Sequence, residues 1–109
     1  MPESPKSSEH PTQLSGFIAY ADQAVVSRQL IKRKAGTVSL FAFDKGQSLS
    51  EHTAPFEAFV EIVDGAAEIV INRQPHTVRA GEFIILPASV PHAVNAIEQF
   101  KMVITMIKE

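Results

Sequence analysis

Short apolar segments separated by turn-forming residues recur from Phe17 to the end of the chain, and this spacing strongly constrains the fold. The turns are marked by Asp44-Lys45-Gly46, by Asp64-Gly65 and by residues 72–75. Segments that begin about every 8–12 residues are typical of β-sandwiches and barrels. No stretch of helical length has a clear 3.6-residue period, and residues 20–26 provide one helical turn at most. We therefore predict an all-β protein.

The length of 109 residues corresponds to a single domain. Residues 1–13 contain three prolines, three serines and almost no apolar side chains. Such a segment buries too little surface to offset the entropy of ordering it. We predict a flexible N-terminal tail over residues 1–13, in which His10 is solvated, and a barrel domain over residues 14–109.

Composition excludes several classes of function. The net charge is -2, so the chain lacks the basic field typical of nucleic-acid binders. Lys32, Arg33 and Lys34 alternate between opposite faces at strand spacing and form no single patch. The absence of cysteine excludes disulfides, thiolate nucleophiles and Cys-ligated zinc. No apolar run approaches the ~18 residues of a membrane helix, and residues 1–13 lack a signal-peptide core. We predict a cytoplasmic protein without nucleic-acid or membrane partners.

The last predicted strand, Phe100 to Ile107, is largely apolar on both faces. One face carries Phe100, Met102, Ile104 and Met106, and the other carries Lys101, Val103, Thr105 and Ile107. A strand that is apolar on both faces is usually covered on both. One face can fill a barrel, whereas the other needs a second sheet or a partner subunit. We predict a homodimer, with a monomer whose second sheet covers this face as the alternative.

Two spaced segments carry a family resemblance. The first contains Gly46, His52 and Gly65, and the second contains Gly81, Pro87 and His92. These six residues fall at positions of the two motifs of the cupin superfamily, which the chain resembles over roughly residues 24–108. The resemblance implies a small single-domain cupin with a double-stranded β-helix, or jelly-roll barrel, over residues 14–109.

The same resemblance points to an incomplete metal site. The family motifs usually supply His, His and Glu from the first segment and His from the second. Here the second His position is Ala54 and the Glu position is Ala58, so only His52 and His92 remain. Two neutral imidazoles leave most of a metal's coordination to water. We expect no cofactor; the alternative is a weakly held zinc, nickel, manganese or iron ion on these two histidines.

Nearby carboxylates are not expected to restore the metal site, because strand alternation points them away from it. Glu57 and Glu61 alternate with Ala58 and are expected to point away from the barrel interior. Glu51 is next to His52 and is also expected to face away. His76 follows a turn in a short polar strand and is expected at the surface.

The two alanines leave volume inside the barrel that apolar side chains can line or refill. Apolar walls with a few convergent polar groups are the usual composition of small-molecule sites. The predicted ligand pocket therefore comprises His52, Ala54, Phe56, Ala58, Phe83, His92 and Met102. The alternative is a core that is packed solid.

Three functions fit these features. The preferred one is binding of a small molecule inside the barrel. The second is an enzyme, because the resemblance implies dioxygenases, isomerases, epimerases or decarboxylases; a metal-free reaction would use His52 or His92 as the base. The third is a dimerising scaffold or sensor that acts through another protein. The sequence leaves the ligand, and any reaction, undetermined.

Overall fold

A computed structural model describes residues 10–109 as eight β-strands and one short 3-10 helix. The elements are η2 (Leu14–Gly16), β1 (Val25–Arg33), β2 (Gly36–Phe43), β3 (Ser48–His52), β4 (Ala58–Ile71), β5 (Gln74–Arg79), β6 (Phe83–Leu86), β7 (His92–Asn95) and β8 (Phe100–Ile107). Most of the predicted tail, residues 1–9, lies outside the described residues, and His10 is exposed. The helical turn predicted within residues 20–26 lies earlier, at η2.

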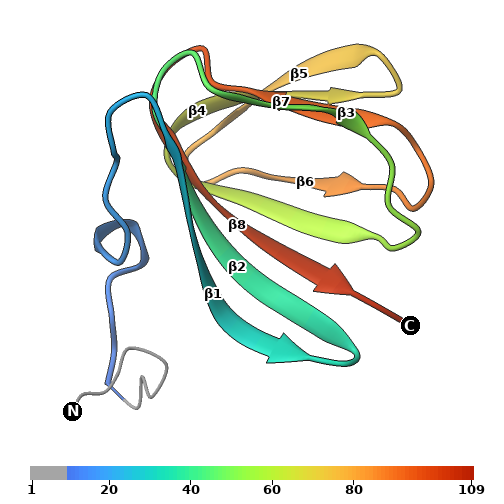
Figure 1. Ribbon diagram of the computed structural model, residues 1–109, viewed down its shortest axis with the longest axis horizontal. Helices are drawn as coiled ribbons and strands as arrows, with labels where there is room; N and C mark the ends of the chain where they lie inside the picture. The colour runs from blue at the N-terminus through green and yellow to red at the C-terminus, as the bar shows by residue number, and fades with distance from the viewer. Residues whose placement is uncertain (1–9) are drawn as a thin grey trace.

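All strand pairs are antiparallel, and they form a curled sheet with two halves (Figure 1). We call them the first and second half-sheets. The first contains β1, β2, β8, the start of β4 and β6, and the second contains β5, the end of β4, β7 and β3. The halves meet where β4 bends and spread apart toward the end of β8. This architecture confirms the predicted all-β class.

The strand β4 passes from one half-sheet to the other through Asp64 and Gly65, where the sequence predicts a turn. That prediction is wrong, because β4 continues from Ala58 to Ile71 with a register shift between Ile62 and Asp64. Gly65 has φ +71°, and a Cβ placed there would lie 2.0 Å from the carbonyl oxygen of Gln99. The glycine therefore permits a sharp bend in a continuous strand against a closely approaching backbone.

The main core lies between the half-sheets. Its centre is the stacked pair Phe43 and Phe100, with ring centroids 4.5 Å apart and both side chains fully buried. Inward-facing Val60 and Ile62 from β4 and Ile69 beyond the bend belong to the same cluster. Ile62 and Ile69 would point to opposite faces by simple alternation, and the register shift between Ile62 and Asp64 changes the phase so that both face the core.

The outer face of the first half-sheet has its own apolar cluster, covered in part by the N-terminal segment. Ile18 packs on Leu40, Ala42 and Val103, with residues 14, 17 and 20 around it. The segment is attached by Lys101 Nζ, which donates to the carbonyl oxygen of Ser15 at 2.6 Å. The chain itself therefore supplies some of the cover that we predicted for the second face of β8, and it does so without a second sheet.

Tyr20 also holds the N-terminal segment on the sheet, because its hydroxyl donates a hydrogen bond to Asp64 Oδ2 at 2.5 Å. Burial, and then the Asp64 carboxylate, raise the pKa of Tyr20 well above its ordinary value of 10.0. A raised pKa gives stability that is present below pH 10 and is lost as the pH rises through the folded-state pKa. We predict that wild type loses this contribution in alkali, and that Tyr20→Phe is less stable by about 1 kcal/mol at pH 8.

Denaturant unfolding of both proteins from pH 8 upward measures this effect. Tyr20 is the only tyrosine in the chain, so tyrosinate absorbance reports on this hydroxyl alone. Parallel stability profiles for the two proteins across the alkaline range would contradict the assignment.

Candidate functional site

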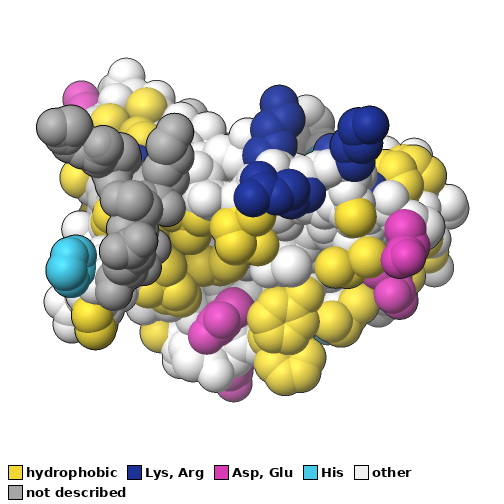
Figure 2. Space-filling model, turned by 90° about the horizontal axis from the view of Figure 1, so that it is seen from below, with side chains coloured by type: hydrophobic (Ala, Val, Ile, Leu, Met, Phe, Trp, Pro, Cys, Tyr) yellow, Lys and Arg dark blue, Asp and Glu magenta, His cyan; other side chains and the backbone are white. Residues whose placement is uncertain are grey.

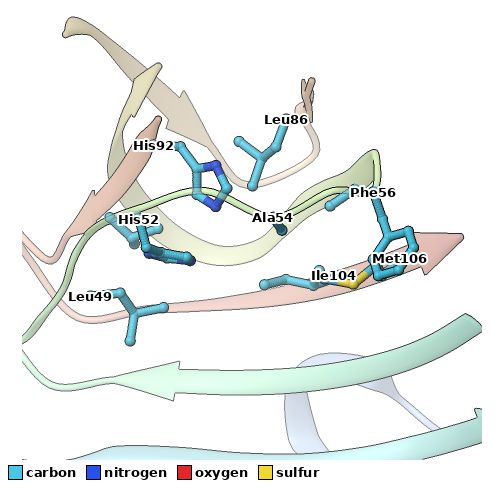
Figure 3. A pocket seen from close by; sticks show the side chains of 10 residues that line it. Leu49, His52, Ala54, Phe56, Leu86, His92, Ile104 and Met106 are labelled. Atoms are coloured by element: carbon cyan, nitrogen blue, oxygen red, sulfur yellow. The ribbon is translucent and has the colours of Figure 1, made fainter. Parts of the chain in front are cut away.

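His52 and His92 are brought together by strand pairing. His52 is the last residue of β3, His92 is the first residue of β7, and the two are register partners. Their ring centroids lie 4.4 Å apart, with the planes 69° from parallel. Figure 3 shows both rings beside the same pocket. The second half-sheet thus joins the two motif histidines at one end of the barrel.

A backbone carbonyl orients each imidazole. The Nδ1 atom of His52 lies 2.7 Å from the oxygen of Ser50, and the Nδ1 atom of His92 lies 3.2 Å from the oxygen of Val90. A carbonyl oxygen only accepts, so a neutral ring in either place carries its proton on Nδ1. That tautomer leaves the lone pair of each ring on Nε2.

His92 is the buried member of the pair, with 7% of its surface exposed. Burial lowers the pKa of His92 from its ordinary value of 6.5, and the neighbouring His52 lowers it further, whereas the contact with Val90 opposes the shift. This lowered pKa favours the neutral form of the His92 ring. His52 is exposed at the other side of the pair.

The two rings lie at a cavity of about 80 Å³. Its lining is mainly hydrocarbon, and it comprises Leu49, His52, Ala54, Phe56, Ala58, Leu86, His92, Val94, Ile104 and Met106 (Figure 3). The lining runs from the exposed His52 to the buried Ala58 and Leu86, so the cavity reaches from solvent into the barrel. Since a water molecule needs about 10–15 Å³ of such space, the volume suits several waters or a small organic group.

Five of the predicted pocket residues line this cavity, namely His52, Ala54, Phe56, Ala58 and His92. Two others do not, and the structure corrects their placement. Phe83 is 60% exposed and stacks on Phe59 at 4.8 Å on the outer face, because Leu86 sets the inward parity of β6. Met102 is 0% exposed and lies deeper in the main core, as the register partner of Ile62.

Five other residues line the cavity that were not predicted from the sequence: Leu49, Leu86, Val94, Ile104 and Met106. Three of them carried a usable signal. Ile104 and Met106 share a face of β8 with Met102. The register pairs Ala58 with Met106, so the cavity lies at the C-terminal end of β8. Similarly, Val94 is two residues from His92 and therefore lies on the same face of β7.

The donor atoms at this site do not fit the metal that the family motifs usually hold. Ala54 and Ala58 contribute only methyl groups to the cavity. Glu51 and Glu57 are exposed, and Glu61 alternates with inward-facing Val60 and Ile62. Nowhere in residues 10–109 do three His, Cys, Asp or Glu side chains gather in a metal-binding group. Two imidazole nitrogens are therefore the protein ligands available in the cavity.

Other sequence predictions concern the surface. His76 is exposed on β5, as predicted, and residues 32–34 are exposed at the end of β1. Within the described part of the chain, no helix is long and apolar enough to cross a membrane.

Comparisons with known proteins agree with this geometry. A model of the cupin domain matches residues 39–108. A conserved protein of unknown function from Streptococcus pyogenes is 33% identical, with 93% of this chain and 89% of that chain covered and a TM-score of 0.89. A cupin superfamily protein from Desulfitobacterium hafniense is 27% identical, with 93% of each chain covered and a TM-score of 0.88.

Among curated proteins, Protein SchB from Streptomyces halstedii is 32% identical over 59 residues, which are 53% of this chain. The match covers 43% of SchB, so the aligned part spans less than half of that protein. The family match extends over β2 to β8 and includes both motif histidines. This chain is a member of the cupin family.

Proposed function

We propose that this cupin binds a small molecule in the cavity that His52 and His92 line. The observation that carries the proposal is a solvent-reaching cavity whose walls are apolar except for two adjacent imidazoles. Apolar walls with a few convergent polar groups are the normal composition of a small-molecule site. The volume of about 80 Å³ lies below the usual 300–1,000 Å³, which limits the enclosed part of the ligand to a few atoms.

Filling the cavity is expected to abolish this binding. Ala58 is buried and lines the cavity, so Ala58→Leu places three further carbon atoms inside it. We predict that a screen of very small fragments by ligand-detected NMR yields binders to wild type that are lost in this variant. Ala80→Leu makes the same change at an exposed position and serves as the control. Fragments that bind all three proteins equally would contradict the proposed site.

Metal-free acid–base chemistry is a second candidate function, favoured by the buried position of His92 in the cavity wall and by the direction of its pKa shift. An imidazole with a lowered pKa and an Nε2 lone pair can act as a general base. His52 is a second imidazole in ring contact with His92, at the exposed side of the cavity. Isomerase or epimerase chemistry of this kind needs no metal. The dioxygenase alternative needs a metal, and two of the usual metal-ligand positions hold alanine here.

We also propose that the chain forms a homodimer through the uncovered part of its outer face. Large apolar side chains remain exposed there beyond the reach of the N-terminal segment, and we call Phe59, Phe83, Ile85 and Ile107 the outer patch. Hydrophobic side chains reach the surface in several places in Figure 2. Phe59 and Phe83 stack on each other and present one continuous aromatic surface. A second copy would cover this surface with an identical one.

A charge within the outer patch is expected to weaken the dimer. Central aromatic residues often contribute 2 kcal/mol or more to an interface, so Phe83→Glu should raise the dimer dissociation constant at least about 30-fold. Sedimentation velocity across a concentration series measures this constant. Ile97→Glu changes another exposed apolar residue outside the patch and should have no effect. A wild type that stays monomeric at the highest concentration would contradict the proposal.

Three further predictions from the sequence stay predictions. The expected lack of a cofactor follows from the poor donor set, with a weakly held transition metal as the alternative. The lack of a nucleic-acid partner follows from the net charge of -2. The cytoplasmic location is the third of these predictions.

A further inference from the structure

We propose that the ligand of this cavity is a small, neutral, mainly apolar molecule that presents an O–H or N–H donor to the imidazole pair. A phenol or a simple alcohol represents this chemical class. The inference rests on the proposed function and specifies the ligand that the site selects.

The first support is the direction of the hydrogen bonds that the two rings already make. His52 and His92 each hold a backbone carbonyl oxygen at Nδ1, which assigns the proton of a neutral ring to that nitrogen. Each Nε2 is then an acceptor, and within residues 10–109 neither Nε2 has a hydrogen-bond partner. A ligand that donates satisfies one or both of these atoms, whereas a ligand that only accepts does not.

The second support is the absence of a cation in the cavity wall. The ten lining residues include no Lys or Arg. No positive charge in this wall therefore offsets the loss of hydration when a carboxylate or phosphate enters the cavity. The strands and turns around His92 carry Glu51, Glu57, Glu61, Asp64, Glu68 and Arg73, none of which lines the cavity. Glu68 accepts from Asn95 Nδ2 at 2.9 Å on the opposite face of β7. An anionic ligand is therefore disfavoured.

The third support is the match between cavity size and a compact ligand. A cavity of about 80 Å³ is smaller than the 150 Å³ engineered cavity that binds benzene. A phenol-sized molecule thus leaves part of its ring in the opening, where Phe56 and His52 are partly or fully exposed. Its hydroxyl can still approach the imidazole pair, because His52 is at the opening and His92 is inside.

Four probes of similar size separate the possible ligand chemistries: phenol donates, anisole only accepts, toluene does neither, and benzoate is an anion. Their dissociation constants are measured by NMR titration at pH 7.5. Because one hydrogen bond contributes about 0.5–1.5 kcal/mol, phenol is expected to bind about three- to tenfold more tightly than toluene or anisole. Benzoate is expected to bind more weakly than toluene.

Matched variants test the role of the rings. His92→Phe keeps an aromatic ring but removes the acceptor, so the ratio of phenol to toluene affinity should fall to about one. His52→Phe makes the same change at an exposed position, which keeps the test valid if the buried substitution unfolds the protein. His76→Phe on β5 changes an exposed histidine outside the cavity and should leave the ratio unchanged.

The outcomes distinguish the two proposals. A phenol preference that disappears in His92→Phe or His52→Phe supports the donor ligand. A preference for benzoate, or a phenol preference that survives both changes, overturns it while the cavity remains a binding site. If none of the four probes binds but other fragments bind and are lost in Ala58→Leu, the ligand class is wrong and the proposed function stands. If no fragment binds wild type, the proposed function itself fails.

Discussion

Replacing Ala54 by His and Ala58 by Glu in the same chain is expected to raise its affinity for Zn²⁺ by at least about 100-fold. Both alanines line the cavity beside His52 and His92 and occupy the cupin motif positions that usually carry those ligands. Wild type offers two imidazoles and leaves the remaining positions of a four-coordinate ion to water. Losing only a supporting residue behind a ligand typically costs 10–100-fold, so gaining two direct ligands should exceed that range.

Calorimetric titration of metal-stripped, tag-free proteins measures this change. The control variant Ala35→His with Ala88→Glu introduces the same side chains at two exposed alanines outside the cavity, and it should bind zinc like wild type. The account would be wrong if wild type and the double variant bound zinc with the same affinity. A wild type that already retained the ion through purification and chelation would contradict it equally.

Gly65→Ala is expected to lower the free energy of unfolding by about 3–5 kcal/mol. At φ +71° an L-residue is strained by about 1–2 kcal/mol, and the new Cβ would also collide with the carbonyl oxygen of Gln99 at 2.0 Å. That oxygen belongs to the backbone, so relief requires β4 and the start of β8 to move apart. Urea unfolding monitored by circular dichroism gives the two free energies.

Gly46→Ala separates the conformational strain of a positive φ from the collision with neighbouring backbone. Gly46 has φ +88°, but a Cβ there would meet no atom within 4 Å, so this variant carries the conformational strain alone. We expect it to lose about 1–2 kcal/mol. Equal losses for the two variants would show that the close backbone approach at Gly65 contributes nothing to stability.

The comparison of these glycines also shows how far the sequence predicts the fold. The spacing of apolar segments and turn residues predicted an all-β fold, and the resemblance of the two motif segments predicted a cupin. Asp64-Gly65 was nevertheless misread as a turn, because local turn preferences carry no information about Gln99, which approaches from a distant part of the chain. The N-terminal cover was missed for the same reason, since Ile18 meets Leu40 and Val103 only in the folded chain.

The candidate site was predictable where motif spacing or alternation identified a face. His52 and His92 occupy motif positions, and the structure makes them strand partners. The run from Phe83 to Leu86 is apolar throughout, so its pattern gives no sign of which side chains face outward. Which residues of β8 lie beside the cavity depends on the register of β8 with β4, and the sequence does not reveal that register. Met102 was therefore predicted to line the pocket in place of Met106.

The most direct test of the account is a long-range ¹H–¹⁵N correlation spectrum of the histidine rings at pH 7.5, recorded with and without phenol. We predict that His52 and His92 both carry their proton on Nδ1 and that phenol perturbs the Nε2 signals of these rings, but not those of the exposed His76. Protons on Nε2 in the free protein, or Nε2 signals that do not respond to phenol at saturating concentration, would contradict it.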